Sequence, residues 1–87
     1  MSRIIFTEKG FEQYLYWQGE DRKTLRKINS LLKSIDRDGV LRGEGKPEKL
    51  KHKKGEYSRR INDEDRLVYE IVNGDICVKA CRGHYEE

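Results

Sequence analysis

The sequence predicts an α+β fold in which a helical hairpin packs on one face of a largely antiparallel four-stranded sheet. Apolar residues recur at helical spacing up to residue 36. Three short runs rich in β-branched and aromatic residues follow residue 55, and an Asn73-Gly74 pair, a strong hairpin signal, separates the last two. The predicted order is β-α-α-β-β-β in a single domain over residues 1–87, because 87 residues leave no room for two cores.

The N-terminal half is predicted to contain one strand and two helices. RIIF at residues 3–6 is a short β run, and Thr7 is placed to cap a helix over residues 8–18. The segment GED at 19–21 ends this helix and begins a second one over residues 22–36. This second helix has the strongest periodicity in the chain, carried by Leu25, Ile28, Leu31, Leu32 and Ile35.

The aromatic residues of the first helix are interpreted as packing residues. Its expected buried stripe consists of Phe11, Tyr14, Leu15 and Gln18. Tyr16 and Trp17 are likewise expected to pack in the core or between the helices, and Tyr57 and Tyr69 to lie in the sheet.

The C-terminal half is predicted to form a long loop and three strands. Residues 37–55 contain four glycines, the only proline and five lysines, a composition typical of a loop. The strands follow at residues 56–61, 66–72 and 75–81. In the last strand, alternation predicts that one face, directed at the helices, carries Ile76, Val78 and Ala80, and that the opposite face carries Cys77, Lys79 and Cys81.

The two cysteines are expected to be reduced. Cys77 and Cys81 are four residues apart in a predicted strand, so their Cα atoms would be roughly 13 Å apart. A disulfide needs about 4.4–6.8 Å. The sequence has no second Cys/His pair with zinc-ligand spacing, so we expect neither a metal nor another cofactor.

Charge is distributed unevenly along the chain. Residues 42–60 hold eight Lys or Arg and three Glu, a local charge of +5, whereas the whole chain carries +3. This field favours an anionic partner, such as nucleic acid or an acidic protein. The alternative interpretation is a solvated loop with ordinary surface lysines.

Targeting signals are not apparent in the sequence. The apolar run after Ser2 is too short for a signal peptide, and no stretch approaches the roughly 20 apolar residues of a membrane span. We therefore expect a cytoplasmic protein with no membrane partner.

The sheet face away from the helices is the expected site, because helices on one side leave the other side open. The candidate proton carriers are Glu48, His52, His84 and Tyr85. Either Arg59 or Arg60, together with Arg66, would add positive charge. Taken singly, Glu48 is also compatible with a solvated loop charge and His84 with a frayed terminus.

A carboxylate, an imidazole and arginines can cleave RNA without a metal ion. The nucleophile is the ribose 2′-OH, which already lies close to the phosphorus atom. A base removes its proton, an acid protonates the leaving 5′-oxygen, and cations stabilise the phosphorane. Glu is ionised at neutral pH, and His is accessible in both protonation states.

Four motifs in register resemble one family. They are YLYWQ at 14–18, GKPEKLKH at 45–52, YSRRINDEDRLVYEI at 57–71 and ACRGHY at 80–85. Together they resemble the YoeB (Txe) toxins of bacterial type II toxin–antitoxin modules, within the RelE/ParE superfamily with its microbial-RNase-like fold. The resemblance implies a ribosome-dependent mRNA interferase, a metal-independent endoribonuclease that cleaves mRNA in the ribosomal A site. It also implies as partners a cognate YefM/Axe-like antitoxin, the 70S ribosome and mRNA, and it is compatible with a homodimer.

The same resemblance implies roles for individual residues. Glu48 in the KPE block corresponds to the general base, Arg66 to the group that stabilises the phosphorane, and His84 to the general acid. Tyr85 is expected to stack on or orient the substrate. Further substrate contacts are expected from Lys51, His52 and Arg60.

Two features at the C-terminus depart from the family pattern. Glu86 and Glu87 follow Tyr85, where chains of this family often end. Gly83 precedes His84 and is expected to loosen the tail, since glycine restricts the backbone least.

A non-enzymatic toxin is the alternative function. ParE-type relatives share the scaffold and bind a protein target, DNA gyrase. Such relatives are expected to lack the set of Glu48, Arg66 and His84, which therefore discriminates between the two functions.

Overall fold

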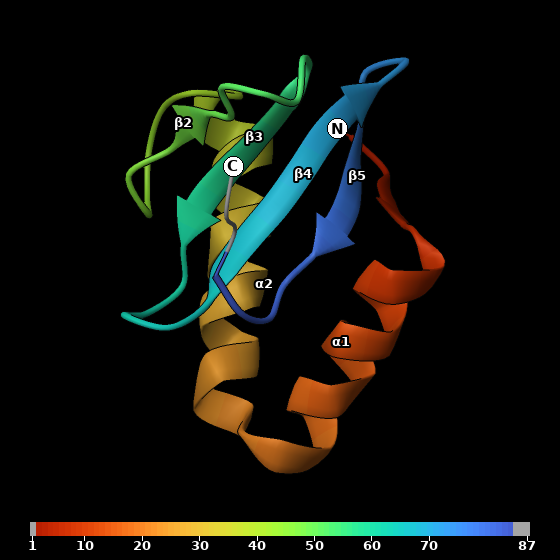
Figure 1. Cartoon of the computed structure of the whole chain (residues 1–87), viewed down its shortest axis with the longest axis vertical. Coiled ribbons are helices and arrows are strands. Elements are labelled where there is room, and N and C mark those ends of the chain that lie inside the picture. The colour runs from red at the N-terminus through yellow and green to blue at the C-terminus, as the bar shows by residue number, and fades with distance from the viewer. Residues whose placement is uncertain (1, 85–87) are drawn as a thin grey trace.

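The computed structural model of the chain describes residues 2–84 and has two helices packed on one face of a mixed five-stranded sheet (Figure 1). The elements, in chain order, are β1 (Ile4–Phe6), α1 (Glu8–Glu20), α2 (Arg22–Asp38), β2 (Glu48–Lys49), β3 (Glu56–Arg60), β4 (Arg66–Val72) and β5 (Asp75–Ala80). The predicted α+β class and the helical hairpin are confirmed. Neither helix is long and apolar enough to cross a membrane, as judged over the described part of the chain.

The sheet has one strand more than predicted. Its order is β1-β5-β4-β3-β2, with β1 parallel to β5 and the other neighbours antiparallel. The additional strand β2 lies within the predicted loop 37–55 and pairs Glu48 with Ser58 and Lys49 with Tyr57. Its two residues are too few for alternation to be visible in the sequence, so the prediction of four strands was wrong.

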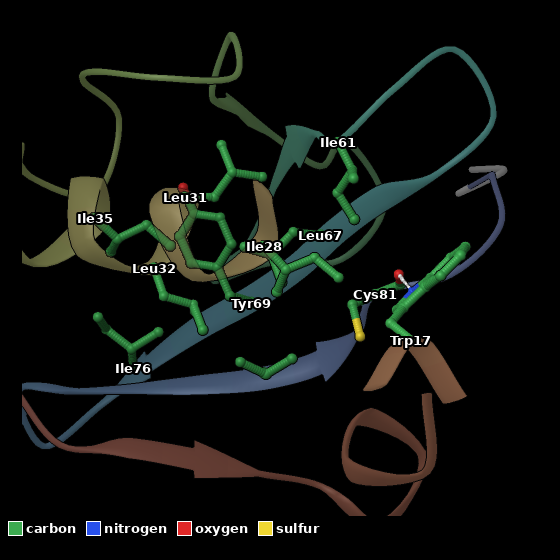
Figure 2. Packing of buried hydrophobic residues seen from close by; sticks show 11 residues of the cluster. Trp17, Ile28, Leu31, Leu32, Ile35, Ile61, Leu67, Tyr69, Ile76 and Cys81 are labelled. Carbon is green, nitrogen blue, oxygen red and sulfur yellow. Dashed lines mark hydrogen bonds between the residues drawn. The ribbon is translucent and has the colours of Figure 1, made fainter. Parts of the chain in front are cut away.

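The core lies between α2 and the centre of the sheet (Figure 2). The predicted apolar stripe of α2 is confirmed, since four of its members are buried and Leu25 packs against them. They contact buried residues of the two central strands, namely Leu67 and Tyr69 on β4 and Ile76 and Val78 on β5. Asp21 caps α2 by accepting hydrogen bonds from the backbone N–H groups of Lys23 and Thr24.

The buried stripe of α1 differs from the expected one. Gly10 and Trp17 are buried and Gln13 and Tyr14 are half-buried, whereas the side chains of the rest of the predicted stripe are exposed: Phe11, Leu15 and Gln18. Tyr16, expected to pack, is also exposed. The reason is the close approach of the helix to β5, where a Cβ at position 10 would lie 2.3 Å from the Val78 carbonyl oxygen. The missing side chain of Gly10 therefore sets which face of α1 is buried.

A β-bulge changes the faces of the last strand. Tyr69 pairs with Val78 but Val68 pairs with Ala80, so β5 contains one additional residue at this point. The bulge reverses the alternation, and Cys81, predicted to face away from the helices, is fully buried in the core. Burial raises the pKa of the Cys81 thiol to about 12, so the thiol stays protonated.

Arg59 on β3 is fully buried and organises the connection between α2 and β2. Its Nε donates a hydrogen bond to the Tyr69 hydroxyl at 2.9 Å, and its Nη1 donates to Ser34 Oγ at 3.1 Å. Its two Nη groups also donate, over 2.7–3.3 Å, to the backbone carbonyls of Gly39, Val40, Arg42 and Glu44. One guanidinium thus donates hydrogen bonds to four backbone carbonyls of this connection.

Asp38 supplies negative charge close to the hydrogen-bonded guanidinium of Arg59. Hydrogen bonds from Arg37 and from Ser34 lower the pKa of the Asp38 carboxyl to about 2, and the charge of Arg59 adds to this effect. Ser34 thereby links the Asp38 carboxylate to the buried guanidinium.

Gly10→Ala is expected to destabilise the protein by about 1–3 kcal/mol, because the new methyl group would overlap the backbone of β5. Gly19→Ala in the same helix is the matched control, since nothing lies within 4 Å of a Cβ there. That variant is expected to gain about 0.5–1 kcal/mol from helix propensity. Urea unfolding measures both, and equal stabilisation by the two alanines would contradict the close approach.

Arg59→Met is expected to lower the free energy of unfolding by about 3–5 kcal/mol, because removal of the guanidinium leaves buried carbonyl groups without its hydrogen bonds. Arg59→Lys should recover only part of this loss, because an ammonium cannot reproduce the planar fork. The exposed Arg26→Met on α2 is the control and should change stability by less than about 0.5 kcal/mol. Thermal and urea unfolding report these differences, and a neutral Arg59→Met would refute the structural role.

Stability should depend on Asp38 in a defined pH range. The folded-state pKa lies below its usual 3.8, so the ionised carboxylate stabilises the fold above that value. This contribution is lost as the pH falls through about 2. The difference in unfolding free energy between the wild type and Asp38→Asn should therefore narrow between about pH 5 and about pH 2. A difference that does not change with pH would show that the carboxylate charge contributes nothing.

Candidate active site

The register of β2, β3 and β4 places four polar residues on the face that the helices leave open. Glu48 pairs with Ser58, and Arg60, two residues further along β3, pairs with Arg66. Residues two apart on a strand point to the same side, so these four side chains share one face. Arg59 points to the opposite face and into the core, which leaves Arg60 as the arginine of β3 at the open face.

Arg66 connects the strands across this face. Its Nη2 donates to Glu48 Oε1 at 3.1 Å, and its Nε donates to Ser58 Oγ at 3.1 Å. The Glu48 side chain is 61% exposed and that of Arg66 is 22% exposed, so the ion pair lies at the surface. Such a pair contributes at most about 1 kcal/mol to stability, which leaves both partners available to another ligand.

The segment after β5 returns to the start of β4. The Arg66 backbone N–H donates to the Gly83 carbonyl at 3.1 Å, and the Gly83 N–H donates to Asp65 Oδ1 at 2.7 Å. His84 is the next residue and is exposed, so the chain brings it to the residue whose side chain contacts Glu48. Gly83 was expected to loosen the tail, but hydrogen bonds hold both its N–H and its carbonyl.

The other predicted residues lie around this centre. Arg60 is exposed at the end of β3, and its guanidinium forms a salt bridge with the Asp63 carboxylate. Lys51 and His52 are exposed in the loop after β2, which is closed by a hydrogen bond from the Leu50 N–H to the Glu56 carbonyl. The predicted substrate contact at Tyr85, together with Glu86 and Glu87, lies outside the described residues.

Two residues of the site were not anticipated from the sequence. Ser58 is fully buried and holds the Arg66 guanidinium, and Asp65 is buried and holds Gly83. For Ser58 a signal existed, since it is the one small polar residue in phase with Arg60 on β3. For Asp65 no local pattern existed, because its partner is distant in the sequence.

The arrangement has the groups needed for acid–base chemistry on an anion. An exposed carboxylate and a guanidinium lie in contact, and an imidazole follows a backbone segment bonded to the same arginine. A phosphate can compete with Glu48 for the planar fork of Arg66. A carboxylate and an imidazole differ in acid–base character, so the two side chains could serve as a base and an acid.

Comparisons with known proteins identify the family of the chain. Residues 6–85 match the model of the YoeB-like toxin of bacterial type II toxin–antitoxin systems. The chain is 48% identical over 85 residues to the toxin YoeB of Synechocystis, covering 97% of this chain and 98% of that protein.

Solved structures give the same result. The YoeB dimer from Staphylococcus aureus is 53% identical, with a TM-score of 0.91 over 97% of this chain and 98% of that one. The YoeB–YefM complex from the same organism is 51% identical, with a TM-score of 0.90 over 98% and 99% of the two chains. The protein is therefore a member of the YoeB family, the toxins of bacterial type II toxin–antitoxin systems.

Proposed function

We propose that the chain is a ribosome-dependent endoribonuclease that cleaves mRNA in the ribosomal A site and thereby stops translation. The single observation that carries this proposal is the contact of Glu48 with Arg66 on the helix-free face, at the point to which the chain returns with His84. Membership of a toxin family supports the proposal, because a toxin must inhibit growth and cleavage of mRNA does so by stopping translation.

The proposed roles follow from the chemistry of the side chains. Glu48 is the general base that takes the proton of the ribose 2′-OH. The 2′-oxygen attacks the adjacent phosphorus, and Arg66 stabilises the additional negative charge of the phosphorane. His84 in its protonated form donates a proton to the leaving 5′-oxygen, which leaves a 2′,3′-cyclic phosphate and a 5′-OH.

Binding of the substrate is proposed to rearrange the ion pair. A phosphate oxygen that accepts a hydrogen bond from Arg66 Nη2 replaces Glu48 Oε1, and the freed carboxylate can then accept the proton of the ribose 2′-OH. Ser58 keeps the guanidinium in place during this exchange, because it binds Nε and leaves the Nη groups for the phosphate. Phosphates further along the RNA contact Lys51, His52 and Arg60, and Tyr85 stacks on a base.

The proposed partners are an antitoxin, the 70S ribosome with its mRNA, and a second copy of the chain. A YefM protein binds the YoeB of Staphylococcus aureus, and that toxin also forms a dimer. The segment 42–60, with its charge of +5, complements an acidic peptide that orders on binding.

Glu48→Gln and His84→Ala are each expected to lower mRNA cleavage by about 10²–10⁴-fold, because each removes a proton-transfer group. Arg66→Lys keeps the charge but loses the fork, so an intermediate loss is expected. Primer extension on mRNA in a cell-free translation system measures the cut sites. Controls of the same chemistry on the exposed helix surface are Glu20→Gln and Arg22→Lys, which should cleave at the wild-type rate.

The products and the substrate supply independent tests. The fragments should carry 2′,3′-cyclic phosphate and 5′-OH ends, and a 2′-deoxy substitution at the scissile ribose should stop the reaction. Cleavage of the deoxy substrate would refute the mechanism. Full toxicity of both Glu48→Gln and His84→Ala would instead favour binding to a protein target, as in ParE-type toxins.

A further inference from the structure

We infer that Asp65 is a positioning residue that fixes the segment carrying His84 and so sets the place of the proposed general acid. The inference rests on the proposed function of His84, but not on any role of Asp65 in contact with RNA. Asp65 is 8% exposed, and its carboxylate Oδ1 accepts from the Gly83 N–H at 2.7 Å. It therefore acts through the backbone next to His84.

Asp65 is itself held rigidly by the turn between β3 and β4. The Asn62 side-chain oxygen accepts from the N–H groups of Glu64 and Asp65, at 2.8 and 2.7 Å. The Asp65 carbonyl accepts from the N–H of Ile61 at 3.0 Å. A carboxylate on such a turn loses little additional freedom when it binds Gly83.

Gly83 has the conformation and the bonding of a fixed turn residue. Its φ of +87° lies in the region that glycine adopts without a steric penalty. Its N–H donates a hydrogen bond to the Asp65 carboxylate, and its carbonyl accepts one from the Arg66 N–H. Two consecutive residues therefore bind the peptide groups on both sides of the Gly83 Cα. The carbonyl bonded to Arg66 belongs to the peptide unit that begins His84.

Helix α1 holds the same segment from the other side. Gln13 Oε1 accepts from the N–H groups of Cys81 and Arg82, at 2.7 and 3.1 Å, and Trp17 Nε1 donates to the Cys81 carbonyl at 2.8 Å. The Arg82 guanidinium lies 3.7 Å from the centre of the Tyr16 ring. These contacts fix residues 81 and 82, and Asp65 fixes the next peptide group, between Arg82 and Gly83, immediately before the one that begins His84.

The test is a double-mutant cycle between Asp65 and His84. Asp65→Ala should slow cleavage by about 10–100-fold in the wild-type background, the range expected for loss of a hydrogen bond to a charged group. In the His84→Ala background the same change should cost less than about twofold, because the group that it positions is gone. Asp65→Asn retains an acceptor oxygen and should stay within about tenfold of the wild type. Glu64→Ala, which removes the neighbouring exposed carboxylate, should leave cleavage unchanged.

The outcomes separate this inference from the proposed function. Equal losses for Asp65→Ala in both backgrounds would overturn the positioning role while leaving His84 as the acid. Full activity of His84→Ala would overturn the proposed function itself. Amide hydrogen exchange tests the contact without catalysis: Asp65→Ala should accelerate exchange of the Gly83 N–H at least about tenfold, and Glu64→Ala should not. Unchanged exchange at Gly83 in Asp65→Ala would refute the inference whatever the cleavage rates.

Discussion

The buried guanidinium of Arg59 is the interaction on which the position of the site depends. It binds the carbonyls of the segment that leaves α2, and the neighbouring Arg60 N–H binds the Gly45 carbonyl at 2.6 Å. Glu48 lies only three residues beyond Gly45, so the connection reaches β2 in a defined register. A loop rich in glycine and lysine would otherwise be free to move, and the proposed base would have no fixed relation to Arg66.

The site joins three parts of the chain that are distant in the sequence. β2 carries Glu48, the start of β4 carries Arg66, and the segment after β5 contains His84. Both of the other parts are hydrogen-bonded to Arg66. Its side chain donates to Glu48 on β2, and its backbone N–H donates to the Gly83 carbonyl in the segment after β5. Residues of α1 support the last segment, so the helical layer takes part in building the opposite face of the sheet.

Regular patterns in the sequence were sufficient for most of the fold. The stripe of α2, the cap at Thr7 and the Asn73-Gly74 turn are local signals, and each appears in the structure. The face of α1, the bulge in β5 and the strand β2 were missed, because each is decided by contacts with residues far along the chain. For the site, the resemblance selected Glu48, Arg66 and His84. Ser58 was visible in the sequence only through its phase with Arg60, and the supporting roles of Arg59 and Asp65 became apparent only when their partners were known.

The most direct measurement is a structure of the protein bound to the 70S ribosome with an mRNA that carries a 2′-O-methyl group at the scissile ribose. The proposed mechanism predicts that the Glu48 carboxylate lies within about 3–4 Å of the 2′-oxygen, that Arg66 binds the scissile phosphate, and that the His84 ring is within about 2.6–3.2 Å of the 5′-oxygen. A phosphate bound elsewhere on the protein, with the Glu48–Arg66 pair intact and His84 directed away from the RNA, would contradict it.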